Sequence, residues 1–247
     1  MKKYLLHANE NYSAYYYSTL LLELTLLACI FLVTIKAQRG KEKKLLLSYL
    51  IALEILFLYT DLAFPLSFFK IISELQYLRS VEFVNETFGV FEVYFGFALY
   101  NLRVHSTPLR NARTISLVLN MAVASFFYYQ IFHAKSYREI YRYAELISAV
   151  VFLSLLVGGV IYFIECYRKN ILLTYYSRLC FVFFSYATIS YLIFPLSIFC
   201  YENLPDTSYW RLLNSYHVIL VLLVAVTITG NLVYKKDTET QYNTFVT

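Results

Sequence analysis

Acidic residues interrupt the apolar segments of this 247-residue sequence, among them Glu23, Glu54, Asp61, Glu86 and Glu92. A charged carboxylate costs roughly 2.5–3.5 kcal/mol near the centre of a bilayer, so none of these side chains should face lipid. Carboxyl groups that turn toward one another inside a helix bundle can bind a cation, a protonatable solute or protons. The alternative is that desolvation protonates some of them, and that they serve only as hydrogen-bonding groups between helices.

Two helical faces carry most of these acids. Glu54 and Asp61 are seven residues apart, which places them on one face of a helix. The segment 81–103 has a continuous stripe of polar and small residues at 4-3-4 spacing, made of Asn85, Gly89, Glu92 and Gly96. Arg103 lies on the same stripe, five turns beyond Asn85. Such stripes pack against other helices, so this segment is predicted to be the central helix, with Arg103 as a lock at its cytoplasmic end.

The candidate ligand site also takes in the last apolar segment, where Asn214 and His217 are one turn apart. By depth, Glu23, Glu54 and Glu92 are expected to form a middle layer. Asp61, Glu86, Asn214 and His217 are expected to form an outer layer. His217 alone is more typical of a hydrogen-bonded core histidine than of a proton relay. The residues predicted to line an outward-facing site are Glu54, Asp61, Glu86, Glu92, Asn214 and His217.

Motifs for catalysis, metal binding or a covalent cofactor are missing from the sequence. No lysine lies within an apolar segment, which excludes a retinal Schiff base, and the four histidines lack His-Glu-x-x-His spacing. The four cysteines lack Cys-x-x-Cys spacing. We therefore expect no catalytic residue, no metal and no cofactor, with an enzyme that acts on lipid through bare carboxylates as the alternative.

The elements that must position these residues are membrane-spanning helices. With 60% apolar and 15% charged residues, the chain departs from the averages of about 50% and 25% in soluble domains. Seven apolar blocks reach the roughly 20 residues that a helix needs to cross a bilayer. They lie near 15–36, 45–69, 81–103, 112–133, 143–166, 176–200 and 210–234. The predicted fold is an all-α polytopic membrane protein with a single seven-helix domain. Most of the 26 tyrosines are expected at the headgroup level.

The loop charges predict the orientation. One set of alternate loops holds thirteen lysines and arginines and the other holds eight, which together account for all 21. Cytoplasmic loops carry the excess of basic residues, so the N-terminus is predicted outside and the C-terminus inside. The net charge of +5 then reflects topology and attraction to anionic lipid, and no nucleic-acid partner is expected.

A sequence repeat predicts two related halves. Phe-Pro-Leu-Ser occurs around Pro65 and again around Pro195, an offset of 130 residues. The same offset aligns the first three blocks with the last three, which predicts half-repeats 15–103 and 145–233 joined by a linker helix at 112–133. The alternative is chance similarity between apolar helices. Each proline should bend its helix, and the serine two residues later can hydrogen-bond a freed carbonyl.

Two stretches carry a resemblance to known proteins. They are 43–50 (Lys-Lys-Leu-Leu-Leu-Ser-Tyr-Leu) and 84–92 (Val-Asn-Glu-Thr-Phe-Gly-Val-Phe-Glu). The chain resembles uncharacterised seven-helix proteins of the bacterial inner membrane, which implies that location. Its 3+1+3 layout is similar to that of seven-helix transporters, opsins and receptors. The retinal lysine of opsins and the Pro-Gln pair of PQ-loop transporters are both missing.

Three functions remain open on these grounds. The first is a receptor-like sensor or binding protein that holds a small polar or cationic ligand and moves the helices containing Pro65 and Pro195. The second is a transporter of a small solute coupled to protons or cations. The third is a structural subunit whose polar stripes face partner chains in a larger membrane complex.

Overall fold

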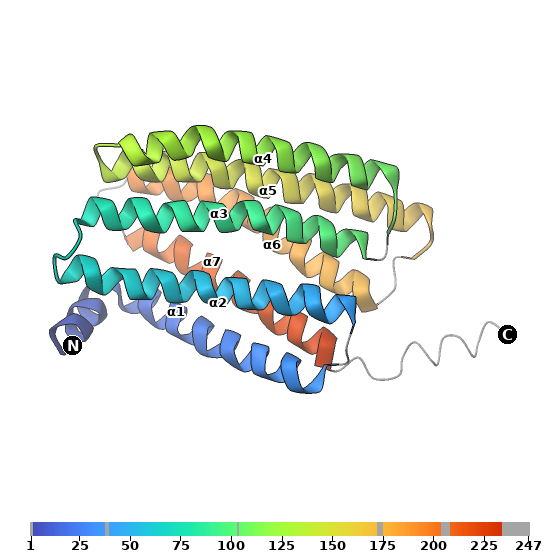
Figure 1. Ribbon diagram of the computed structural model, residues 1–247, viewed down its shortest axis with the longest axis horizontal. Coiled ribbons are helices and arrows are strands. Elements are labelled where there is room, and N and C mark those ends of the chain that lie inside the picture. Colours follow the sequence, from blue (N-terminus) through green and yellow to red (C-terminus); the bar gives the residue numbers. More distant parts are fainter. Residues whose placement is uncertain (1, 38–39, 103, 172–174, 204–207, 234–247) are drawn as a thin grey trace.

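The computed structural model describes residues 2–37, 40–102, 104–171, 175–203 and 208–233, and their regular secondary structure is entirely helical. Consecutive helices run in opposite directions along the long axis of the bundle (Figure 1). The helices are α1 (Lys2–Lys36), α2 (Lys41–Phe68), α3 (Glu74–Asn101), α4 (Thr107–His133), α5 (Tyr137–Arg168), α6 (Tyr175–Asn203) and α7 (Ser208–Val233).

Serine caps begin three of the helices before their apolar segments start. The hydroxyl oxygens of Ser73, Ser106 and Ser136 accept hydrogen bonds from backbone N–H groups at the starts of α3, α4 and α5. At Ser73 the side chain of Gln76 completes a capping box. As a result α3 and α5 begin six or seven residues before the predicted blocks 81–103 and 143–166.

Six segments of the bundle are long and apolar enough to cross a membrane. They belong to all the helices except α3, so the prediction of seven apolar spans holds for six of them. Large apolar side chains point outward, including Leu62, Ile115 and Leu192, which are 71, 67 and 65% exposed. In water this surface would be unfavourable, but it suits contact with lipid tails. The chain is a multi-pass membrane protein.

The neighbours of each helix explain why α3 lacks an apolar segment of the kind found in the other six helices. α3 packs against α2, α4 and α5, and it also touches α6. α1 packs against α2 and α7, whereas α6 packs against α5 and α7. Because protein surrounds α3 on several sides, it can carry Glu82, Glu86 and Glu92 without turning them toward lipid.

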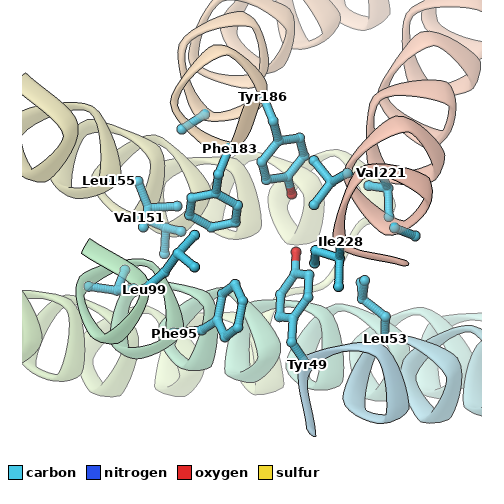
Figure 2. Packing of buried hydrophobic residues seen from close by; sticks show 14 of the residues in the cluster. Tyr49, Leu53, Phe95, Leu99, Val151, Leu155, Phe183, Tyr186, Val221 and Ile228 are labelled. Carbon is cyan, nitrogen blue, oxygen red and sulfur yellow. The ribbon is translucent and has the colours of Figure 1, made fainter. Parts of the chain in front are cut away.

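The core between α2, α3, α5, α6 and α7 is rich in aromatic rings (Figure 2). Tyr49 of α2 stacks on Phe95 of α3 with ring centroids 4.0 Å apart. Phe183 of α6 lies edge-on to both rings, at 6.2 and 5.5 Å. These contacts hold the polar groups described below inside an otherwise apolar interior.

Candidate functional site

The stripe of small and polar residues on α3 faces other helices, as predicted. A Cβ atom at Gly96 would lie 2.6 Å from Leu155 Cδ2 of α5 and 2.7 Å from Phe183 Cε1 of α6. At Gly89 it would lie 3.3 Å from a valine of α5. The glycines therefore let α5 and α6 approach closely around Glu92, which lies between them on the stripe and is 3% exposed.

Glu92 accepts hydrogen bonds from tyrosines on two other helices. The Tyr49 hydroxyl of α2 donates to Glu92 Oε1 at 2.6 Å. The Tyr186 hydroxyl of α6 lies 3.1 Å from Oε1 and 3.2 Å from Oε2. Figure 2 shows the two hydroxyl oxygens pointing toward each other from α2 and α6. One carboxyl group thus joins three helices, through hydrogen bonds that are stronger than neutral ones when the carboxyl group is ionised.

Among the described contacts, His217 of α7 is connected to this carboxyl group through its ring contact with Tyr186. Its Nδ1 lies 3.2 Å from the Ser190 hydroxyl oxygen of α6. Its ring packs against Tyr186 at 5.7 Å, Phe152 at 6.1 Å and Phe194 at 5.1 Å between centroids. This is the environment of a hydrogen-bonded core histidine beside the site.

A second group of carboxyls lies between α3, α5 and α6. The Ser148 hydroxyl of α5 donates to both oxygens of Glu86, at 2.9 and 3.1 Å, and Glu86 is 5% exposed. The Ser197 hydroxyl of α6 donates to Glu145 Oε1 of α5 at 3.3 Å. Glu86 also interacts electrostatically with Glu82, Glu145 and Glu92. The series of carboxyl groups therefore continues along α3 as far as Glu92.

Glu54 and Asp61 lie elsewhere, beside Glu23 of α1. Glu23 interacts with Asp61 and Glu54, and Asp61 interacts with Glu23. No described contact connects these three groups to Glu92. The predicted middle layer of Glu23, Glu54 and Glu92 is therefore divided between two places, because Glu54 and Tyr49 lie on different faces of α2.

Pro65 and Pro195 both lie inside their helices, α2 and α6. Ser197, expected to bond a carbonyl freed by Pro195, donates instead to the carboxyl group of Glu145. Arg103 lies outside the described residues, as does the side chain of Asn214, so neither can be assigned to the site.

Three of the buried acids have no basic side chain bonded to them in the described part of the chain. Among the described residues, no lysine or arginine is bonded to Glu54, Glu86 or Glu92. Arg168 pairs instead with Glu165 at the end of α5, at 3.1 Å. The same described part contains no group of three or more histidine, cysteine or acidic side chains placed to hold a metal ion. The chemistry of the site is thus that of carboxyl and hydroxyl oxygens, which suit protons or a small cation.

Tyr49 and Tyr186 are the site residues that the sequence did not reveal. Most tyrosines were expected near the headgroups, yet these two lie in the core and are 0 and 3% exposed. The sequence gives little indication of their role, because Tyr49 and Tyr186 lie on helices other than that of Glu92. Only the packing of the helices brings the three residues together. Glu82, Glu145 and Ser148 were missed as partners of Glu86 for the same reason.

Comparison with protein-family models, with curated proteins and with solved structures finds no match for this chain. The function of the site is therefore inferred from its own residues.

Proposed function

We propose that this chain is a seven-helix membrane sensor or binding protein that holds a small cationic ligand at Glu92. The observation that supports it most is a nearly inaccessible carboxyl group that α2 and α6 share through Tyr49 and Tyr186. Neutral hydroxyl donors stabilise a carboxylate but leave its charge uncompensated, and a buried charge of this kind is costly until a cation joins it. Glu86, with Ser148, extends the same oxygen-rich surroundings.

The signal in this proposal passes through the helices that the tyrosines join. A cation at Glu92 competes with the tyrosine hydroxyls for the carboxyl oxygens, so it changes the bonds that connect α2 and α6. Pro65 and Pro195 interrupt the backbone hydrogen bonds of these two helices, which makes them easier to bend. Occupancy of the site thereby changes the positions of the helix ends and the loops attached to them.

We further propose that all seven helices cross the inner membrane of a bacterium, with the N-terminus outside and the C-terminus in the cytoplasm. α3 has 28 residues, so it is about 42 Å long, enough to cross the bilayer beside α2. Its position among α2, α4 and α5 supports a crossing despite its polar sequence. The excess of lysine and arginine in alternate loops supports the orientation.

Native mass spectrometry after gentle purification tests the ligand. The wild-type protein should retain a small cationic species that Glu92→Gln loses, because the amide keeps the shape but removes the charge. Glu165→Gln is the matched control, since Glu165 pairs with Arg168 at the end of α5 and should not affect the bound species. Equal retention by wild type and Glu92→Gln, or no bound species in either, would contradict the proposal.

A second candidate function is a cation- or proton-coupled transporter, and the arrangement of the helices favours it. α1 packs on α2 and α7, and α2 packs on α3. α5 packs on α6 and α3, and α6 packs on α7. Exchanging α1 with α5, α2 with α6 and α3 with α7 leaves these neighbours unchanged, with α4 outside the exchange. Two parallel halves of this kind are typical of transporters that bind substrate where the repeats meet.

Further features support two related halves with Glu92 between them. The side-chain amides of Asn101 and Asn231, 130 residues apart, each donate to the carbonyl oxygen four residues earlier, both at 2.7 Å. Ser67 and Ser197 are both buried. Tyr49 belongs to the first half and Tyr186 to the second, so their shared carboxyl group lies where the halves meet.

Proteoliposomes separate the two functions. A transporter should move the species identified at Glu92 across the membrane, and Glu92→Gln should abolish that flux. A sensor should bind the same species with no flux above that of empty liposomes. Flux that Glu92→Gln leaves intact would contradict transport through this site.

A further inference from the structure

A second acidic site lies between α1 and α2, apart from Glu92. Glu23 of α1 and Glu54 of α2 are 9 and 5% exposed, whereas Asp61 of α2 is only partly buried. Glu54 and Asp61 are about 10 Å apart along α2, and Glu23 interacts with both from the neighbouring helix. The three carboxyl groups thus extend from a partly buried position into the bundle.

Three of the four carboxyl oxygens of Glu23 and Glu54 have no hydrogen-bond partner among the described residues. Both carboxyl oxygens of Glu54 are buried without a hydrogen bond, and so is Oε1 of Glu23. An ionised carboxylate in this position would be costly, because its oxygens are out of contact with bulk solvent and no described donor reaches them. A bound proton removes the charge.

The contact between Glu23 and Asp61 also indicates a bound proton. Their carboxyl groups are within hydrogen-bonding reach of each other. Two ionised carboxylates repel at such a distance, and a hydrogen bond between them needs one proton on the pair. Among the titratable groups described on α1, α2, α3 and α7, the ones that interact with these three are the three themselves.

This group is separate from the site at Glu92. At about 100° per residue, Glu54 and Asp61 lie about 120–140° around α2 from Tyr49, which bonds Glu92. Both carboxyl oxygens of Glu54 lack a hydrogen-bond partner among the described residues, so the ligand that fits the trio is a proton.

We propose that Glu23, Glu54 and Asp61 form a proton-binding site whose entrance is Asp61. A proton taken up by the Asp61 carboxylate passes to Glu23 when the O–H bond on Asp61 breaks and one forms on Glu23. Asp61, the least buried of the three, then holds the negative charge and is the first to take up another proton. When Glu54 is ionised, the Glu23 side chain turns toward it, the O–H bond on Glu23 breaks as one forms on Glu54, and a further proton from Asp61 restores neutral Glu23. With both inner carboxyl groups protonated, the charge of the trio lies on Asp61.

Infrared difference spectroscopy in nanodiscs tests this proposal through the C=O stretch of protonated carboxylic acids. At neutral pH, subtracting the spectrum of Glu54→Gln from that of wild type should reveal a protonated-acid band. Glu165→Gln, which removes an ion-paired carboxylate, should reveal only ionised-carboxylate bands. After transfer to heavy water, Asp61→Asn should slow the isotope shift of the Glu54 band several-fold, whereas Glu92→Gln should not change its rate.

An ionised-carboxylate band for Glu54 at neutral pH would overturn the proposal. So would a protonated band that disappears when NaCl replaces choline chloride, since an alkali ion and not a proton would then be the ligand. An isotope shift unchanged by Asp61→Asn would overturn the assignment of Asp61 as the entrance. Glu23→Gln gives a second test, because it should also slow the shift at Glu54. None of these results depends on whether Glu92 binds a cation.

Discussion

Some tyrosine hydroxyl groups in the core donate hydrogen bonds to Glu92 and another does not, and the difference in their contributions to stability is testable. Tyr49 and Tyr186 donate to Glu92. The hydroxyl of Tyr100 is buried with no hydrogen-bond partner among the described residues, although its ring stacks on Tyr162 at 5.1 Å. A hydrogen bond to a charged group contributes about 1.5–3 kcal/mol, and an unpaired buried hydroxyl contributes an unfavourable desolvation term.

Tyr49→Phe is therefore expected to lower the free energy of unfolding by about 1.5–3 kcal/mol, with a similar loss for Tyr186→Phe. Tyr100→Phe is the matched control and should leave it unchanged or raise it. Reversible denaturation in mild detergent measures the three values. Equal losses for all three variants would show that the hydroxyls of Tyr49 and Tyr186 have no special role at Glu92.

At this scale the sequence predicts which residues must avoid lipid but not which ones they meet. The burial of Glu54, Glu86 and Glu92 follows from the cost of a carboxylate in hydrocarbon. Their partners depend on the rotation and register of neighbouring helices. Two tyrosines among 26 could not be singled out, because nothing in their local sequence distinguishes them from anchors at the headgroups.

Among the elements, α3 combines low hydropathy with a central position, and its glycines make this possible. The space that Gly96 leaves open is occupied by Leu155 and Phe183, which are 0 and 1% exposed. Because both neighbours are held in the core, an added methyl group forces them to move.

Gly96→Ala is expected to destabilise the protein by about 1–3 kcal/mol, the usual range for overpacking in a tight core. Gly230→Ala in α7 is the control, since an added Cβ there meets nothing within 4 Å. It should stabilise the helix by up to about 1 kcal/mol through the better helix propensity of alanine. Thermal unfolding of both variants measures the contrast, and a neutral Gly96→Ala would show that α5 and α6 do not press on α3 as described.

The 4-3-4 stripe predicted from spacing alone which face of α3 packs against other helices. In a membrane helix, polar residues are unfavourable in contact with lipid and small residues allow close helix approach, so both pack against protein. The helix ends were less predictable. Hydropathy marks the apolar block, whereas Ser73 and Ser136 begin α3 and α5 well before it by capping free N–H groups.

For the whole molecule, the proposed orientation makes a prediction for reporter fusions in bacteria. A green fluorescent protein at the C-terminus should fluoresce, and alkaline phosphatase at the same position should be inactive, because the C-terminus is proposed to be cytoplasmic. A phosphatase inserted between α6 and α7 should be active. The opposite pattern would contradict the orientation, and matching activities on both sides of α3 would contradict its crossing.

The sequence predicted the helical bundle and the membrane location, because both follow from hydropathy and length. It also suggested two related halves, because the Phe-Pro-Leu-Ser motif occurs twice, 130 residues apart. The separation of the acids into two groups could not be predicted, since it depends on α1 covering one face of α2 while α3 covers another.

The central claim is that Glu92 binds a small cation inside the bundle. The most direct test is the thermal unfolding of wild type and Glu92→Gln in nanodiscs, titrated with NaCl, KCl and choline chloride at constant ionic strength. We expect at least one of these cations to raise the midpoint of the wild type saturably, and the same cation to have no such effect on Glu92→Gln. Equal shifts in both proteins, or no saturable shift in the wild type with any of the three, would contradict the claim.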